Sequence, residues 1–198
     1  MKKPLWIWII SLALAAFWAP PRPALAGTPT AYVRGILDQV MGLQNDPALS
    51  TQARSKAIHQ IIERNFDFAM MAEESLGPTY ERLSGGQRQE FTRTFSYLFQ
   101  DSYARLVLNF LKKENIQYGR ELPEGEKARV DTAIVRTNEN IPVTYLMHTA
   151  PQAWILYDVM VDGVSILQNY KTQFAQVIHT KSFEFLLNKM QEQRRAIQ

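Results

Sequence analysis

Apolar positions in the first half of the chain recur every three or four residues, which is the spacing of amphipathic helices. The first stripe consists of Val33, Ile36, Leu37, Val40 and Leu43. The second stripe consists of Ile58, Ile61 and Ile62. A turn at residues 45–47 separates the two stripes, and either Ser50 or Thr51 can cap the second helix. Asp67 is placed to cap a short third helix, which the Gly-Pro pair at residues 77–78 ends.

A longer helix is expected after residue 84. Ser84 and Gln87 are three residues apart and can form a capping box, which marks a helix start. The apolar positions that follow are Phe91, Phe95, Leu98, Phe99, Tyr103, Leu106, Val107, Phe110 and Leu111. This stripe is wide and rich in aromatic side chains, so the helix presents a large apolar surface to the rest of the fold.

After Lys112 the pattern changes to the alternation of β-strands, with many Val, Ile, Tyr and Thr residues. Strands are predicted over residues 130–137, 141–149 and 153–161, with a short fourth strand near 164–167. In the second strand one face carries Ile141, Val143, Tyr145 and Met147. In the third strand the alternation puts on one face Ile155, Tyr157, Val159 and Val161.

The chain is predicted to end in one more amphipathic helix. Its apolar members are Phe174, Val177, Ile178, Phe183, Leu186, Leu187 and Met190. Helices followed by strands and a last helix indicate an α+β fold. We expect an antiparallel β-sheet of about four strands, wrapped by the N-terminal helices and the C-terminal helix.

The first 26 residues have the features of a secretory signal peptide. Lys2 and Lys3 precede an apolar run of 14 residues from Leu5 to Trp18, and residues 24–26 read Ala-Leu-Ala. The run is shorter than the roughly 20 residues of a membrane span, although an uncleaved anchor is the alternative. We expect cleavage near Ala26-Gly27, a single mature domain over residues 27–198, and a periplasmic location in a Gram-negative bacterium.

Charge and cysteine content narrow the function further. The chain has 22 Lys and Arg against 19 Asp and Glu. Lys2, Lys3 and Arg22 leave with the signal, so the mature chain has 19 of each and offers little support for nucleic-acid binding. The absence of cysteine excludes disulfides, thiol catalysis and cysteine-ligated metal.

Few residues suggest catalysis or metal binding. Residues 83–87 read Leu-Ser-Gly-Gly-Gln, the ABC-ATPase signature, but no phosphate-binding Gly-rich loop accompanies them, so we interpret them as a turn and a capping box. His59, His148 and His179 have no neighbours at metal-ligand spacing. Asp158 lies among apolar strand residues, where it is either a general base in a pocket or a structural anion held by backbone amides or an Arg.

Several segments resemble the MlaC-like family of periplasmic phospholipid-binding proteins, also called the toluene-tolerance family. The segments are residues 65–68, 75–77, 87–91, 95–103, 154–159, 162–165 and 169–174. The last three are similar in order and spacing to the family's aromatic-x-x-Tyr-Asp-Val, Glu-Gly-Val-Ser and Tyr-Arg-x-x-Phe motifs. Asp162 replaces the usual Glu, and Lys171 replaces the usual Arg.

The resemblance implies a lipid carrier without covalent chemistry of its own and without a cofactor. Such a protein is expected to shuttle a phospholipid between an outer-membrane lipoprotein complex and an inner-membrane complex with a lipid-binding ring and an ABC transporter. The family's role in outer-membrane lipid asymmetry follows from that transport. The mature chain has no arginine cluster to clamp a phosphate, so a hopanoid-like polycyclic lipid is the alternative cargo.

The lipid chains are expected in an apolar pocket between the sheet and the long helix. The expected wall residues are Phe95, Phe99, Tyr103, Val107, Tyr145, Met147, Tyr157, Val159 and Val161. For each of them, packing in an ordinary core is the competing interpretation.

Two other classes of function stay open. The first is a small-pocket isomerase or hydrolase that uses Asp158, which requires a cavity beside that carboxyl group. The second is a periplasmic holdase or interaction protein with a solid core, which would carry no lipid. Enclosed apolar space in the structure separates the carrier from the holdase.

Overall fold

The computed structural model describes residues 27–111, 114–151 and 153–197. Within these residues the first part of the chain forms α1 (Pro29–Asn45), α2 (Thr51–Asn65), α3 (Phe68–Leu76), α4 (Pro78–Glu81) and α5 (Gly85–Phe110). The strands are β1 (Asn115–Glu124), β2 (Lys127–Val135), β3 (Asn140–Thr149), β4 (Trp154–Val161) and β5 (Val164–Ser165). The chain then forms α6 (Ile166–Thr180) and α7 (Phe183–Ile197). The predicted signal segment lies outside the described residues.

Local side-chain caps begin the helices where the sequence predicts them. Ser50 and Asp67 each accept a hydrogen bond from the backbone amide three residues on, at 3.1 and 2.9 Å. The predicted capping box forms: the amide of Gln87 donates to Oγ of Ser84, and the amide of Ser84 donates to Oε1 of Gln87. Residues 83–87 are therefore a turn and a helix start, as the sequence analysis predicts.

All strands of the sheet are antiparallel, in the order β1-β2-β3-β4-β5. The predicted α+β class is confirmed, but the sequence analysis missed β1. This strand contains Gly119 and Pro123, is mostly exposed, and has an irregular register between Tyr118 and Glu121. A β-alternation is hard to recognise in such an edge strand, because only one of its edges has to pair and its side chains contribute little to the core.

The C-terminal region differs from the prediction of one final helix. The structure has two helices, α6 and α7, with a break at Lys181 and Ser182. Lys181 has φ −130° and ψ −100°, outside the helical region, and Oγ of Ser182 accepts a hydrogen bond from the amide of Phe185. Apolar residues recur at helical spacing on both sides of the break, so the sequence pattern did not predict that the chain turns there.

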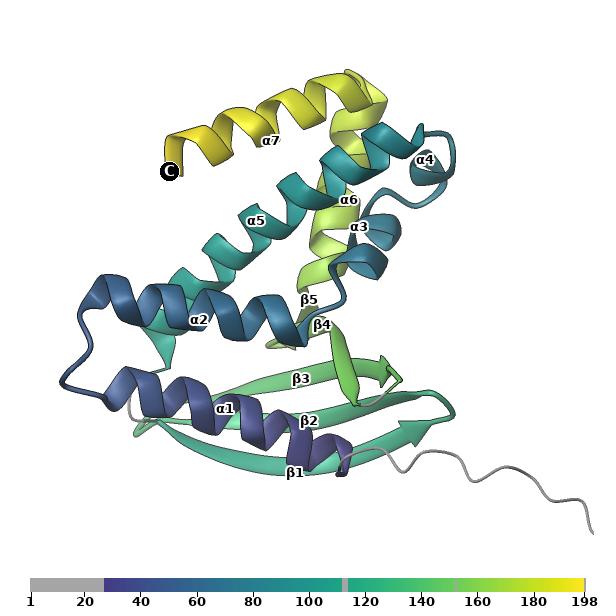
Figure 1. Cartoon of the computed structure of the whole chain (residues 1–198). Helices are drawn as coiled ribbons and strands as arrows, with labels where there is room; N and C mark the ends of the chain where they lie inside the picture. The colour runs from purple at the N-terminus through teal and green to yellow at the C-terminus, as the bar shows by residue number, and fades with distance from the viewer. Residues whose placement is uncertain (1–26, 112–113, 152, 198) are drawn as a thin grey trace, which may run out of the picture.

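The helices cover one face of the sheet (Figure 1). α1 runs across β1 and β2, while α2 and α5 lie above it and α7 lies farthest from the sheet. Fully buried side chains from both layers form one core; the largest are Phe91, Phe95, Phe99, Ile58, Met71, Met147 and Leu156. No helix among residues 27–111, 114–151 and 153–197 is both long and apolar enough to span a bilayer.

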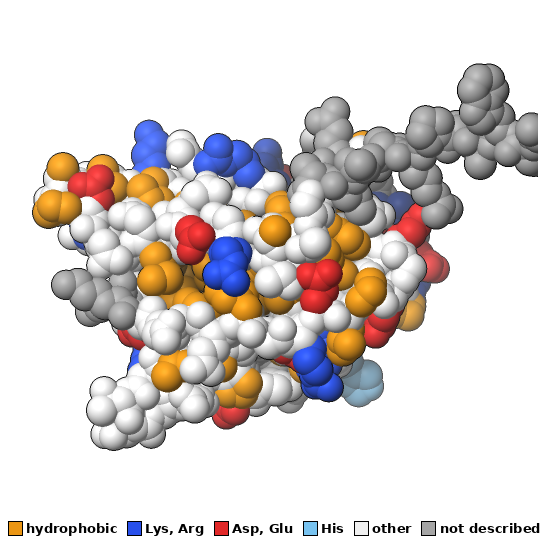
Figure 2. Space-filling model, turned by 90° about the horizontal axis from the view of Figure 1, so that it is seen from below, with side chains coloured by type: hydrophobic (Ala, Val, Ile, Leu, Met, Phe, Trp, Pro, Cys, Tyr) orange, Lys and Arg blue, Asp and Glu red, His pale blue; other side chains and the backbone are white. Residues whose placement is uncertain are grey.

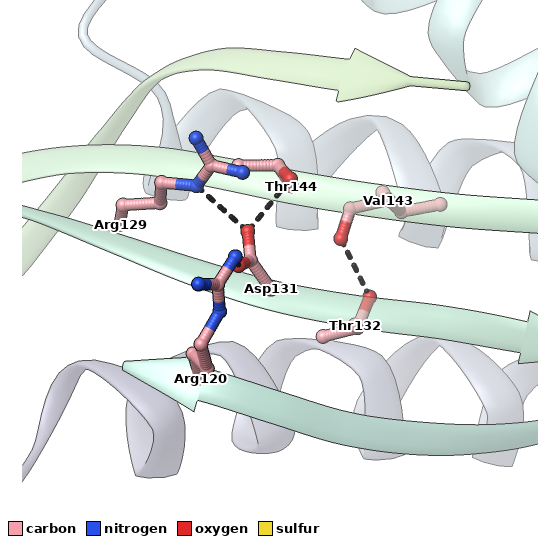
Figure 3. Close-up of polar contacts among 6 residues, drawn as sticks. All are labelled: Arg120, Arg129, Asp131, Thr132, Val143 and Thr144. Atoms are coloured by element: carbon pink, nitrogen blue, oxygen red, sulfur yellow. Dashed lines mark hydrogen bonds and ion pairs between the residues drawn. The ribbon is translucent and has the colours of Figure 1, made fainter. Parts of the chain in front are cut away.

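The other face of the sheet carries a polar cluster that joins three strands (Figure 3). Oδ1 of Asp131 on β2 accepts hydrogen bonds from Nε of Arg129 at 2.7 Å and from the hydroxyl of Thr144 on β3 at 2.9 Å. Arg120 on β1 forms an ion pair with Oδ2 of Asp131 at 3.4 Å. The cluster therefore ties the edge strand to the centre of the sheet.

The molecule seen from below presents no surface of a single charge (Figure 2). Hydrophobic side chains lie in the middle of this view, with Lys and Arg interspersed among Asp and Glu. A nucleic-acid-binding face would need a continuous basic patch, so this view agrees with the balanced charge of the mature chain.

Candidate functional site

A register shift in β4 decides which of its side chains face the helices. Tyr145 of β3 lies opposite Val159, whereas Met147 lies opposite Leu156. Two steps along β3 thus match three along β4, which is the pattern of a β-bulge. Leu156 and Val159 consequently face the helices, and Tyr157 does not.

The predicted shared face of Tyr157 with Val159 and Val161 is therefore wrong. The ring of Tyr157 lies 6.1 Å from the ring of His148, between centroids, and 5.3 Å from Nζ of Lys127. Lys127 and His148 are next to Ala128 and Met147 in their strands, so their side chains lie on the opposite face of the sheet from those two residues. Strict alternation holds only where the pairing of two strands has no extra residue. The bulge adds one residue to β4, so the side chains that precede it in β4, including Tyr157, lie on the opposite face from the one that alternation predicts.

A cavity of about 140 Å³ lies between α5 and the sheet. We call it the sheet cavity. It is lined by Tyr103, Leu106, Val107, Leu111, Ile134, Ile141, Val143, Tyr145 and Val161. Four of the nine predicted wall residues are among them, and none of the lining side chains carries a charge.

The two tyrosines of the sheet cavity are neutral polar groups. Burial raises the pKa of Tyr103 well above its ordinary value, and the nearby charge of Asp158 raises it further. Burial also raises the pKa of Tyr145 well above its ordinary value, only partly offset by the hydrogen bond between its hydroxyl and Thr132. Both phenols stay protonated at physiological pH, so the cavity suits a molecule that is apolar and uncharged where it is enclosed.

A second and larger hollow of about 500 Å³ lies between α5, α6 and α7. We call it the helical groove. It is lined by Phe95, Leu98, Phe99, Ser102, Tyr103, Leu106, Ile166, Asn169, Tyr170, Gln173, Phe174, Val177, Leu186, Lys189, Met190 and Gln193. The predicted wall residues Phe95, Phe99 and Tyr103 lie here, and Tyr103 therefore borders both hollows.

Aromatic packing holds the side chains of the groove in place. Tyr170 of α6 meets Phe95 of α5 edge-on at 5.3 Å between ring centroids. Phe99 and Tyr103 stack at 5.7 Å with an angle of 16° between their rings. Such pairs add about 0.5–1.5 kcal/mol each beyond the burial of their surface. The aromatic stripe of α5 is thus shared between the groove and the packing of α6.

Two further predicted wall residues, Met147 and Val159, line neither hollow. Both are fully buried, with 0% of their surface exposed, and pack in the core. The sheet cavity is also lined by five residues that the sequence analysis did not predict as wall residues: Leu106, Leu111, Ile134, Ile141 and Val143. The alternation along β3 already placed Ile141 and Val143 on the same face as Tyr145, so the sequence could have predicted these two as wall residues. Leu106 and Leu111 belong to the stripe of α5, where periodicity alone cannot separate core from cavity.

Asp158 is held as a structural anion. Its Oδ1 accepts hydrogen bonds from the amides of Val159 at 2.8 Å and Leu167 at 3.0 Å. Its Oδ2 accepts from the hydroxyl of Ser165 at 2.5 Å. Asp158 as a residue is 4% exposed, and it lines neither the sheet cavity nor the helical groove. The interpretation of Asp158 as a structural anion is confirmed. A general base would have to face a cavity that can hold a substrate, and Asp158 faces neither of the two hollows.

The histidines and acidic residues form no metal centre in the part of the chain that the structure describes. No group of three or more His, Cys, Asp or Glu side chains is placed there to hold an ion. Nε2 of His148 lies 3.0 Å from Oδ2 of Asp67, the residue that caps α3. The amide of Asp67 also donates to the carbonyl of Leu156 at 2.8 Å. This pair therefore links α3 to the sheet.

Fold and site together define a class: an α+β domain in which a charge-free apolar cavity separates an antiparallel sheet from a long aromatic helix. The chain belongs to the MlaC family, since the family model described as MlaC protein matches residues 34–192.

One curated protein and one solved structure are similar to this chain. The intermembrane phospholipid transport system binding protein MlaC of Haemophilus influenzae is 25% identical over 207 residues, covering 97% of this chain and 93% of the relative. The structure of a phospholipid-binding protein from Ralstonia solanacearum, solved in complex with a phospholipid, has a TM-score of 0.74 at 20% identity. The match covers 86% of this chain and 98% of that one, and it establishes the fold.

Proposed function

We propose that this protein is a periplasmic carrier that binds a lipid in the sheet cavity and moves it between membranes. The observation that supports this most strongly is the sheet cavity itself, because its lining is apolar and uncharged and includes four residues of the predicted wall. Membership of the MlaC family and the phospholipid bound in the Ralstonia solanacearum relative point to a phospholipid as cargo.

The binding energy of such a carrier comes from burial alone. Each methylene group moved from water into an apolar cavity contributes about 0.8 kcal/mol. No nucleophile or general base is needed, and Asp158, which the sequence analysis considered as a general base, already accepts three hydrogen bonds within the protein. Lipid uptake and release are therefore reversible binding steps without covalent chemistry.

The sheet cavity has to widen when a lipid enters. Its volume of about 140 Å³ is below the ~300–1,000 Å³ of typical ligand pockets. Leu106 is 38% exposed and Tyr103 is half-buried, so both side chains on the α5 wall have room to move. We expect the ligand to displace these two side chains and to leave the strands in place.

The proposed route includes two partners and one location. The name of the Haemophilus influenzae relative describes a binding protein of an intermembrane phospholipid transport system. By that analogy we expect an outer-membrane lipoprotein complex at one end and an inner-membrane ring with an ABC transporter at the other. Cleavage near Ala26-Gly27 would release the mature domain, residues 27–198, into the periplasm.

Native mass spectrometry of the mature protein, prepared from periplasm without detergent, tests this function. We expect one added mass that lipid extraction identifies as a phospholipid. The mass of a hopanoid would support the carrier function and show that the cargo is a hopanoid. A bare polypeptide that takes up no lipid from vesicles would overturn the carrier function and favour the holdase.

Substitutions of two valines test whether the lipid binds in the sheet cavity. Val161→Phe fills the cavity from β4 and is expected to remove the bound lipid. Val135→Phe is the matched control, because Val135 is also half-buried at a strand end but does not line the cavity. Equal lipid occupancy in both folded variants would contradict the assignment of the sheet cavity as the lipid-binding site.

A further inference from the structure

A third hollow lies where α1 and α2 meet the turn between β3 and β4. Its volume is about 410 Å³, which is in the range of ligand pockets, and we call it the hairpin groove. It is lined by Tyr32, Arg64, Asn65, Ala150, Pro151, Ala153, Trp154 and Ile155. None of these residues lines the sheet cavity or the helical groove, so lipid binding in those two hollows does not account for the hairpin groove.

One wall of the hairpin groove is apolar. The turn and the start of β4 supply this wall: Ala150, Pro151, Ala153 and Ile155. The amide of Ala150 donates a hydrogen bond to the carbonyl of Ala153 at 2.7 Å, which closes the turn. Pro151 is exposed and Ile155 is half-buried, so an apolar group that enters the groove can cover both side chains.

The polar side chains from α1 and α2 mostly satisfy one another. The hydroxyl of Tyr32 donates to Oδ1 of Asn65 at 2.8 Å, and Nδ2 of Asn65 donates to the carbonyl of Ile61 at 2.7 Å. Burial raises the pKa of Tyr32 to about 12, so this phenol is neutral at physiological pH. No Asp or Glu is among the described lining residues, so no negative charge opposes an anion in the groove.

Hydrogen-bond donors, by contrast, are in surplus. Arg64 is exposed and is the one charged side chain among the described lining residues. Its Nε donates to the carbonyl of Gln60 at 3.0 Å, which leaves the other guanidinium N–H groups available. Trp154 is only 7% exposed, and its Nε1 has no acceptor among the described residues. Buried donors are rarely left unpaired in native proteins, so this N–H indicates that an acceptor from outside the chain belongs in the groove.

We infer that the hairpin groove binds an organic carboxylate that carries a short apolar group. One carboxylate oxygen pairs with the guanidinium of Arg64, and the other accepts from Nε1 of Trp154. Charge-assisted hydrogen bonds of this kind are stronger than neutral ones, and a carboxylate is an acceptor on both oxygens. The apolar group lies against Pro151 and Ile155. A free small acid and the C-terminus of a polypeptide share this chemistry. The site is separate from the lipid-binding hollows, so the inference does not depend on the carrier function.

Trp154 reports directly on this site. The chain has four tryptophans, and Trp6, Trp8 and Trp18 lie in the first 26 residues, so protein from Gly27 onward has a single indole N–H. Its resonance in proton–nitrogen correlation NMR should move downfield when a ligand oxygen accepts from Nε1. The probes are hexanoate, N-acetyl-leucine and N-acetyl-leucine amide, which lacks the carboxylate. We expect at least one acid to shift the resonance and the amide to bind at least about tenfold more weakly. Binding of hexanoate supports a free acid as ligand, whereas binding of N-acetyl-leucine alone supports a chain terminus.

Two variants and a matched control connect the binding to the proposed contacts. Arg64→Gln should weaken binding of the acid by about tenfold or more, because it removes the charged partner. Arg82→Gln is the control: Arg82 is also exposed, its Nε also donates to the carbonyl four residues earlier, and it does not line the groove. Trp154→Phe keeps an apolar ring and removes the donor, and calorimetry should show weaker binding of the acid. Thermal unfolding establishes that each variant is folded.

Three results would overturn the inference. The first is a wild-type protein that binds neither acid at millimolar concentration. The second is binding that is equally tight in Arg64→Gln and Arg82→Gln, because the guanidinium would then not be a partner. The third is saturation by an acid that leaves the indole resonance in place, because Nε1 would then not donate to the ligand. Lipid that copurifies with the protein is measured separately, so failure of the hairpin groove leaves the carrier function standing.

Discussion

The hydroxyl of Ser165 donates a hydrogen bond to Oδ2 of Asp158 at 2.5 Å, and the same oxygen of Ser165 accepts from the amide of Gln168 at 2.9 Å. Ser165 is the N-cap of α6, so this single side chain fastens the helix to β4. The amide of Leu167 reinforces the connection through Oδ1 of Asp158. The position of one wall of the helical groove thus depends on a carboxylate that does not line it.

Replacing Asp158 is expected to destabilise the fold. Asp158→Ala leaves the amides of Val159 and Leu167 buried without their partner, which costs about 1–3 kcal/mol for each group. Ser165→Ala should cost less, about 1–2 kcal/mol, because it removes one cap and one hydrogen bond. Urea denaturation of the two variants gives both values. An Asp158→Ala protein as stable as the wild type would contradict the structural role.

The stability of the sheet should fall in acid through Asp131. Burial by itself raises the pKa of Asp131, but hydrogen bonds from Arg129 and Thr144 and the charges of Arg129 and Arg120 outweigh it and hold the pKa below its ordinary value. A lowered pKa in the folded state stabilises the protein above the unfolded pKa, near 3.8, and this contribution is lost as the pH falls through the folded value.

Unfolding at a series of pH values measures this effect. Asp131→Asn should reduce the slope of stability against pH in the acid range. Arg129→Met should lower the free energy of unfolding at neutral pH by about 0.5–1 kcal/mol, because the pair is partly exposed. An acid slope that is identical in Asp131→Asn and the wild type would show that Asp131 does not contribute.

Lipid uptake should be independent of pH between about 7.5 and 9.5, where unperturbed tyrosines begin to ionise. Burial raises the pKa values of Tyr103, Tyr145 and Tyr170, which keeps all three neutral in this range. Uptake from zwitterionic phosphatidylcholine vesicles isolates the protein's contribution, because the lipid charge does not change. A marked loss toward pH 9.5 would mean that one of these phenols ionises in this range and that its pKa is not raised.

Met147 is expected to matter for stability and not for cargo. Its side chain is 0% exposed, so Met147→Ala should lower the free energy of unfolding by about 2–5 kcal/mol. The folded fraction should still bind lipid as the wild type does, since Met147 lines neither hollow. Leu146→Ala, on the other face of β3, is the control and should cost less. Loss of lipid from a folded Met147→Ala protein would extend the site to that residue.

Removing the hydroxyl of Thr94 should stabilise the protein or leave its stability unchanged. Thr94 is 0% exposed on α5, and its Oγ1 has no hydrogen-bond partner among the described residues. Valine keeps the shape of the side chain and removes the unsatisfied polar atom, so we expect a gain of up to about 1 kcal/mol. Thermal unfolding measures it. A clear loss of stability in Thr94→Val would indicate that the hydroxyl is satisfied in solution.

The sequence by itself determined the features that depend on neighbours in the chain. Asp67 and Ser84 cap helices because their side chains reach amides only three residues away. The role of Asp158 was narrowed to two alternatives by the cost of burying a lone charge, and the structure supplied the partners. The aromatic stripe of α5 was evident from its period, which needs no knowledge of what the helix packs against.

Tertiary structure alone decided which apolar residues enclose space. The bulge between Leu156 and Val159 depends on how β4 pairs with β3, so alternation within β4 put Tyr157 on the wrong face. The break at Lys181 turns α7 back over α5, and this return is what closes the helical groove. Apolar side chains that fill a core and those that line a cavity satisfy the same periodicity. The difference between Met147 and Tyr145 is therefore set by the distance between α5 and the sheet, which no local pattern encodes.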